Sequence, residues 1–150
     1  MKVALVQRNY TVADLEGNAA RIAEATRQAM KHGADLVVTS EVALLGYPAR
    51  NLLLHPAFIA RSGEVLEQLA RELRGALPVL VGIAELNEAS QGRALFNSAV
   101  LVEDGKLATR FRKCLLPTYD VFDEDRYFEP STSPQVLERR GRVTAARAND

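Results

Sequence analysis

Short apolar runs alternate with helical periodicities along most of the chain, and this order limits the possible folds more than any other feature. Runs typical of buried strands cover Lys2–Gln7, Ala34–Thr39, Val79–Glu85, Leu95–Val102 and Lys106–Arg112. Between the first three runs, apolar residues recur at helical spacing over Asn18–His32 and from Pro56 to about Gly75. The order β-α-β-α-β-β-β predicts an α/β layer arrangement whose sheet mixes parallel and antiparallel strands.

Local signals predict how these segments end. Gly33 stands where a helix C-cap belongs, and Asp104-Gly105 is a strong hairpin signal between two strands. The stretch Arg139–Asp150 (RRGRVTAARAND) is rich in Arg and Ala and has one β-branched aliphatic residue, so we expect no strand there. We therefore predict one incomplete domain over residues 1–138 and an atypical tail over 139–150.

Composition and charge exclude several classes of function. The 150 residues include 19 basic and 19 acidic side chains, so the zero net charge offers no attraction for nucleic acid or an anionic membrane. No stretch approaches the apolar length of a transmembrane helix. Cys114 is the sole cysteine, so no intrachain disulfide forms, and the two histidines lack metal-ligand spacing. We expect a cytoplasmic protein that binds neither nucleic acid nor membrane.

Two charged residues follow predicted strands, where ligands gather in open α/β sheets. Glu41 comes directly after an apolar strand, and a carboxylate there can act as a general base. Lys113 ends the fifth strand, where an ammonium group can stabilise an oxyanion. The alternatives are a solvated glutamate and a lysine that protects an edge strand from pairing.

The segment after Lys113 carries further candidates. Cys114 could be a nucleophile. Adjacent residues of a strand point to opposite faces, however, so Lys113 and Cys114 could not both face one pocket. We therefore expect a structural role for Cys114. Aromatic residues concentrate in the loop that follows, which indicates either a functional loop or a satellite hydrophobic cluster: Tyr119, Phe122, Tyr127 and Phe128.

Four segments together resemble the nitrilase (carbon-nitrogen hydrolase) superfamily and, within it, the glutaminase domain of glutamine-dependent NAD synthetases. They are the opening strand with its Gly17-Asn18 helix entry, Gly33–Pro48 (GADLVVTSEVALLGYP), Asn51–Phe58 (NLLLHPAF) and Phe111–Phe128 (FRKCLLPTYDVFDEDRYF). The last segment is the most specific. The resemblance runs over about residues 3–131 in the correct order.

This resemblance implies a partial α-β-β-α sandwich and a set of roles. Glu41 would be the general base, Lys113 the lysine that stabilises the transition state, and Glu124 a second glutamate that supports the site. Tyr119 and Phe122 would line the glutamine pocket. The implied reaction is hydrolysis of the glutamine amide, which supplies ammonia for ATP-dependent amidation of deamido-NAD.

Several positions depart from the family pattern. Ser40 replaces a usual proline, and Thr118 and Asp120 stand where Asn and Gly are common. The family's nucleophilic cysteine, in a Cys-Glu pair after a further apolar strand, has no counterpart before Asp150. We therefore expect a chain truncated before the nucleophile, inactive alone and homo-oligomeric. It would have no cofactor of its own, since ATP and magnesium would belong to an absent synthetase domain.

Two other interpretations stay open. The first is a stand-alone amidase, carbamoylase or nitrilase of the same superfamily, against which NLLLHPAF (Asn51–Phe58) argues mildly. The second is a non-catalytic remnant that only binds partners, which the unusual composition after Glu138 supports.

Overall fold

A five-stranded mixed sheet forms the centre of the fold in the computed structural model, which describes all residues except 90, 120–122, 140–141 and 146–150. Its strands follow one another in chain order: β1 (Val3–Val6), β2 (Leu36–Thr39), β3 (Val79–Leu86), β4 (Leu95–Glu103) and β5 (Lys106–Arg112). The first three strands are parallel, and β4 and β5 each run antiparallel to the preceding strand. The predicted α/β class and mixed sheet are confirmed.

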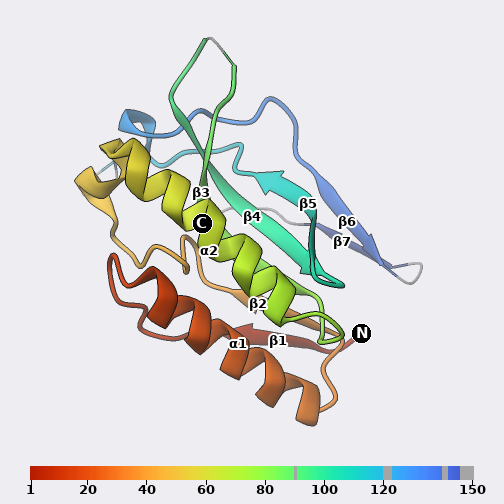
Figure 1. Cartoon of the computed structure of the whole chain (residues 1–150). Coiled ribbons are helices and arrows are strands. Elements are labelled where there is room, and N and C mark those ends of the chain that lie inside the picture. Colours follow the sequence, from red (N-terminus) through yellow and green to blue (C-terminus); the bar gives the residue numbers. More distant parts are fainter. Residues whose placement is uncertain (90, 120–122, 140–141, 146–150) are drawn as a thin grey trace.

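Two helices, α1 (Leu15–Lys31) and α2 (Pro56–Glu72), connect the parallel strands and cover one face of the sheet (Figure 1). They bury apolar side chains against Val37, Val79 and Val81 in the larger of two hydrophobic clusters. Of the positions with helical spacing in α1, Ile22 is fully buried, whereas Met30 is half-exposed near the end of the helix. Short 3-10 helices, η1 (Arg50–Leu54) and η2 (Glu124–Arg126), flank the sheet.

The opposite face of the sheet carries a second apolar cluster. It joins four strand residues with Leu137: Leu36, Leu80, Leu101 and Phe111. Leu137 lies in β6 (Val136–Arg139), which pairs antiparallel with β7 (Arg142–Ala145). The expectation of no strand in 139–150 is therefore wrong for β7. Main-chain pairing with a preceding strand forms this hairpin, although the segment lacks the apolar run that usually signals a strand.

Strand directions bring distant residues to one edge of the sheet. Because β4 runs antiparallel to β3, it begins at the edge where β3 ends, and β5 ends at that same edge. The loop after β2, the first residues of β4 and the residue after β5 therefore meet there. At the opposite edge, the predicted hairpin is confirmed: Asp104 and Gly105 have φ of 50° and 79°, the paired positive values of a type I′ turn.

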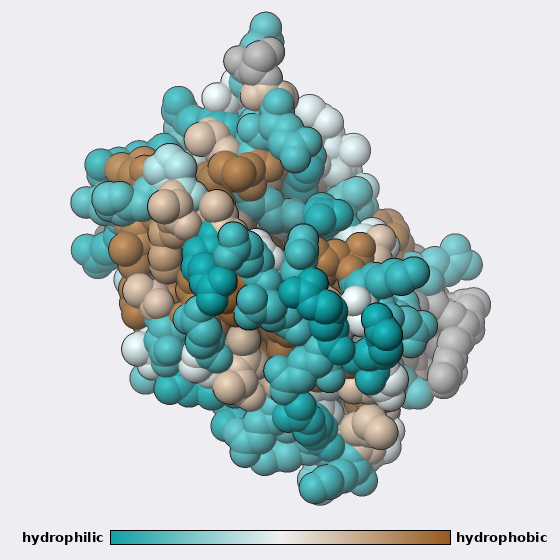
Figure 2. Space-filling view, in the orientation of Figure 1, coloured by the Kyte–Doolittle hydropathy of each residue, from teal (hydrophilic) through white to brown (hydrophobic). Residues whose placement is uncertain are grey.

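Hydrophilic residues cover most of the helical side of the molecule, and hydrophobic residues show between them (Figure 2). Over the part of the chain that the structure describes, neither helix has the length and hydrophobicity needed to cross a bilayer.

Candidate active site

Three charged side chains from separate segments meet at this edge of the sheet. Lys113 Nζ donates to Glu41 Oε1 at 2.8 Å and to Glu124 Oε1 at 3.1 Å. Glu41 follows β2, Lys113 follows β5, and Glu124 begins η2. The structure thus brings together the three residues that the sequence singled out as catalytic.

Two of these three side chains, Lys113 and Glu124, are largely buried, unlike most charged side chains. The side chains of Lys113 and Glu124 are only 10% and 11% exposed, whereas that of Glu41 is 42% exposed. Burial acts to lower the pKa of Lys113, but hydrogen bonds and charge from both glutamates outweigh it and raise that pKa. Burial and the charge of Glu41 raise the pKa of Glu124, partly offset by Lys113. Lys113 therefore stays an ammonium ion at neutral pH.

The loop that carries Glu41 is held in an unusual main-chain conformation. Val42 has φ of 49°, which a β-branched residue rarely adopts. Its carbonyl accepts from the N–H groups of Leu45 and Gly46, each at 3.0 Å, while Leu44 N donates to Gly82 O on β3 at 3.1 Å. Surrounding contacts thus fix a strained residue beside Glu41, an arrangement that clusters at functional sites.

Gly82 allows this loop to approach the sheet. A Cβ atom built at Gly82 would lie 2.4 Å from Ser40 O and 2.6 Å from Val42 N, both main-chain atoms. Gly82 N donates to Thr39 Oγ1 at 3.1 Å and closes the contact. The absence of a side chain at this position therefore sets where Glu41 stands.

Asn97 is a member of the site that the sequence analysis missed. Its Nδ2 donates to Glu41 Oε1 and also to Glu124 Oε2 at 3.5 Å. The residue is 5% exposed and lies in β4. One signal was present: Asn97 and Ser98 are the only polar side chains within the otherwise apolar stretch Leu95–Val102.

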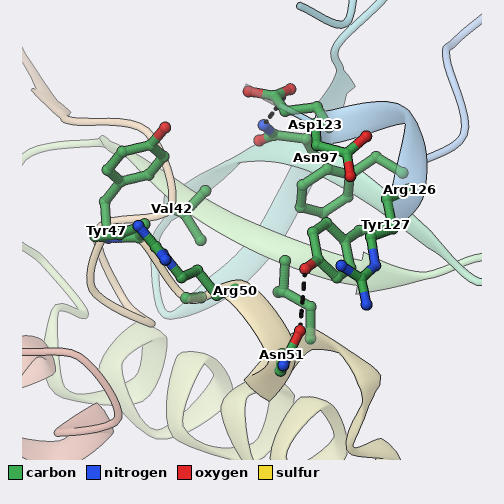
Figure 3. Close-up of a pocket in the computed structure, with 13 residues that line it drawn as sticks. Val42, Tyr47, Arg50, Asn51, Asn97, Asp123, Arg126 and Tyr127 are labelled. Atoms are coloured by element: carbon green, nitrogen blue, oxygen red, sulfur yellow. Dashed lines mark hydrogen bonds between the residues drawn. The ribbon is translucent and has the colours of Figure 1, made fainter. Parts of the chain in front are cut away.

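A cavity of about 670 Å³ opens beside these residues and includes Asn97 and Glu124 in its wall (Figure 3). Besides Glu124, three other charged residues lie on its lining, namely Arg50, Asp123 and Arg126. Tyr127 Oη donates to Asn51 Oδ1 at 3.3 Å across another part of the wall. The remaining lining residues are Val42, Tyr47, Pro48, Ala49, Leu53 and Phe128. The volume suits a small-molecule ligand.

The other sequence candidates lie elsewhere. Tyr119 is 69% exposed and is not among the lining residues, and Phe122 falls outside the described residues, so their role in a glutamine pocket stays a prediction. Cys114 Sγ contacts Arg112 O at 3.8 Å. Among the described residues, no group of three or more His, Cys, Asp or Glu side chains is placed to hold a metal ion.

This arrangement can perform proton transfer beside a fixed positive charge. Glu41 is accessible enough to take a proton from a nucleophile. The Lys113 ammonium, held by two carboxylates, can stabilise an oxyanion that develops within hydrogen-bond distance. Such a pair suits nucleophilic attack on an amide or related carbon-nitrogen bond.

Comparison with known proteins agrees with this chemistry. The model of the carbon-nitrogen hydrolase family matches residues 2–147. The chain belongs to the carbon-nitrogen hydrolase family. Its resemblance to that family, expected from four sequence segments, is confirmed.

Curated relatives of this carbon-nitrogen hydrolase include two glutamine-dependent NAD(+) synthetases. That of Synechocystis sp. is 46% identical over 138 residues, which cover 90% of this chain and 25% of the relative. That of Thermotoga maritima is 38% identical over 138 residues, which cover 91% of this chain and 23% of the relative. The chain spans about a quarter of the length of the curated relatives it matches.

Solved structures show the same fold. The glutamine-dependent NAD+ synthetase from Acinetobacter baumannii superposes with a TM-score of 0.84 at 32% identity, over 94% of this chain and 26% of that one. An amidase from Nesterenkonia sp. superposes with a TM-score of 0.75 at 22% identity, over 95% of this chain and 53% of that one. The second likeness concerns the fold alone.

Proposed function

We propose that this chain carries the glutaminase site of a glutamine-dependent NAD synthetase, where the side-chain amide of glutamine is hydrolysed and ammonia is released. The contact of Lys113 with both Glu41 and Glu124 carries the proposal, because it supplies a base and a fixed positive charge at one place. The 46% and 38% identical relatives, both glutamine-dependent, support glutamine as the substrate.

In the proposed reaction, Glu41 takes the proton of a thiol and the sulfur attacks the amide carbon. A carbon–sulfur bond forms, and the oxyanion of the tetrahedral intermediate lies against the Lys113 ammonium. The intermediate then breaks its carbon–nitrogen bond, and ammonia leaves with the proton that Glu41 held. Water hydrolyses the thioester, which yields glutamate and restores the thiol.

The thiol is the part that the 150 residues do not supply to this site. Cys114 is the sole cysteine, and its sulfur contacts the Arg112 carbonyl rather than any of the three charged side chains. We therefore expect no ammonia release when the 150-residue polypeptide alone is incubated with glutamine. Ammonia release that Cys114→Ala abolishes would contradict this expectation and make Cys114 the nucleophile.

Binding separates the glutaminase proposal from the alternative of a stand-alone amidase. We expect calorimetry to show weak glutamine binding, in the millimolar range or about −4 kcal/mol, and weaker binding of butyramide. Glutamine carries charged amino and carboxylate groups, which Asp123 and Arg50 on the cavity wall can attract. A preference for butyramide would favour the amidase, and failure of both ligands to bind would favour a non-catalytic remnant.

The remaining expectations also stay proposals. Self-association is supported by the exposed apolar side chains of β1, the edge strand, where Leu5 is 75% exposed. We retain a cytoplasmic location and the assignment of ATP and magnesium to a synthetase domain as expectations from the resemblance.

A further inference from the structure

We propose that Asn97 is a positioning residue of this site, whose side-chain amide holds the carboxylates of Glu41 and Glu124 in place around Lys113. The inference rests on the proposed function only in giving those three residues a catalytic role. The claim that Asn97 restricts the Glu41 side chain depends only on the observed hydrogen bonds.

The Asn97 side chain lies in the wall of the cavity and contacts both glutamates. It is 5% exposed, and its Nδ2 donates to an oxygen of each carboxylate, Glu41 Oε1 and Glu124 Oε2. Glu41 and Glu124 come from the loop after β2 and from η2, so a residue of β4 connects elements far apart in sequence. Figure 3 draws a hydrogen bond that leaves the side-chain nitrogen of Asn97.

Chemistry makes an amide well suited to this position. Ionised carboxylates only accept hydrogen bonds, whereas the Asn side-chain nitrogen has two protons to donate. Two carboxylates close together repel each other, and one ammonium group, Lys113, lies between them. A neutral donor that reaches both reduces this repulsion without adding a charge that would compete with Lys113.

The main chain of Asn97 also forms a hydrogen bond with Lys113. Lys113 N donates to Asn97 O at 2.8 Å, which continues the β4–β5 pairing by one residue beyond Ser98 and Arg112. One residue therefore contacts all three charged residues, the two glutamates through its side chain and Lys113 through its main chain. A side-chain substitution at Asn97 leaves the main-chain contact to Lys113 available and removes only the contacts to the carboxylates.

Glu41 is the group for which this restraint matters most. Its side chain is 42% exposed, and its hydrogen bonds from described residues come from Lys113 and Asn97. A general base must stay within reach of the proton it removes, and a freely rotating surface glutamate does so only part of the time. Asn97 thus limits the rotamers that Glu41 can adopt.

The test compares side-chain mobility in three variants of the 150-residue polypeptide. Asn97→Ala removes the donor, and Asn97→Asp keeps the shape but replaces the donor with a carboxylate. Ser98→Ala is the matched control, because Ser98 is the next residue of β4, is 4% exposed, and has a hydroxyl with no hydrogen-bond partner among the described residues. Side-chain NMR relaxation would report the motion of Glu41. Glu67 of α2, whose side chain is 62% exposed and forms a 3.6 Å surface ion pair with Arg71, is the reference for a surface glutamate.

We expect Glu41 to be restricted in the wild type and in Ser98→Ala, and to become more mobile, toward the level of Glu67, in both Asn97 variants, where the bond from Lys113 remains. Of the described residues, Glu41, Lys113 and Tyr47 interact electrostatically with Glu124, and Asn97→Asp should raise the pKa of Glu124 further by adding a negative charge. A role in packing alone would leave Glu41 restricted in Asn97→Asp, which preserves volume.

A Glu41 side chain as restricted in Asn97→Asp as in the wild type would overturn the inference. If Asn97→Ala does not fold, Asn97→Asp still decides, since it conserves the shape of a buried side chain. Neither measurement uses glutamine, so a chain that fails to bind glutamine would refute the proposed substrate and leave the positioning role to be judged separately.

Discussion

Replacing Gly82 with alanine should move the loop that carries Glu41, because the added methyl group meets main-chain atoms. The Cβ would lie 2.4 Å from Ser40 O and 2.6 Å from Val42 N. Neither atom belongs to a flexible side chain that could rotate away. The two residues flank Glu41, so any relief of the clash displaces Glu41.

The size of the displacement follows from contact distances. Restoring an ordinary separation of about 3.4 Å requires Ser40 O to retreat by about 1 Å. A shift of that size would lengthen the 2.8 Å bond between Glu41 and Lys113 to about 3.8 Å, beyond hydrogen-bond distance. Overpacking of this kind costs about 1–3 kcal/mol of unfolding free energy. The melting temperature should fall by roughly 2–12 °C.

Gly63→Ala provides a matched control, since it is the same substitution at a helical glycine of α2 with open space around the new Cβ. That variant should be stabilised by about 0.5–1 kcal/mol, because alanine favours the helix. Thermal unfolding followed by circular dichroism measures both changes. Equal melting temperatures for Gly82→Ala and the wild type would refute the claim that the glycine permits this approach.

Three further predictions concern folding and pH. Asn18→Ala should lower the unfolding free energy by about 2–4 kcal/mol. The buried Asn18 side chain accepts a hydrogen bond from Thr11 N and donates to Thr11 O and Leu44 O, and alanine makes none of these. An unchanged midpoint of urea unfolding would contradict this prediction. The raised pKa of Glu124 means that the folded chain holds this proton more tightly, so stability is lost as pH rises from the ordinary value of about 4.3 through the raised one. Glu124→Gln should therefore lose less stability than the wild type over that window in urea titrations at successive pH values, and equal losses would argue against a raised pKa. The raised pKa of Lys113 acts in the same direction at alkaline pH: it contributes stability that is fully present below about 10.4 and is lost as pH rises through the raised value, and Lys113→Met should remove this loss.

The sequence predicts the strands and helices well because periodicity reports burial directly. Each of the five sheet strands begins or ends within two residues of its expected position, and the Asp104-Gly105 turn follows from local chemistry alone. The strand β7 was missed because its pairing depends on β6 rather than on an apolar run of its own. The short helices η1 and η2 carry no comparable periodic signal.

The candidate site was only partly accessible from the sequence. Glu41, Lys113 and Glu124 came from strand ends and from the family resemblance, and the fold brings them together. Asn97 could not be found in this way, because its importance lies in contacts across 56 and 27 residues of chain. The role of Gly82 is likewise a property of the packed loop rather than of its own strand.

The position of Lys113 between the two glutamates is the central claim, and the NMR signal of its ε-ammonium group tests it most directly. At neutral pH the signal should differ from those of Lys31 and Lys106, exchange slowly with water, and shift more when glutamine is added than when butyramide is added at the same concentration. Glu41→Gln and Glu124→Gln should each change it. A Lys113 signal that coincides with those surface lysines, and responds to neither glutamate substitution nor glutamine, would contradict the account.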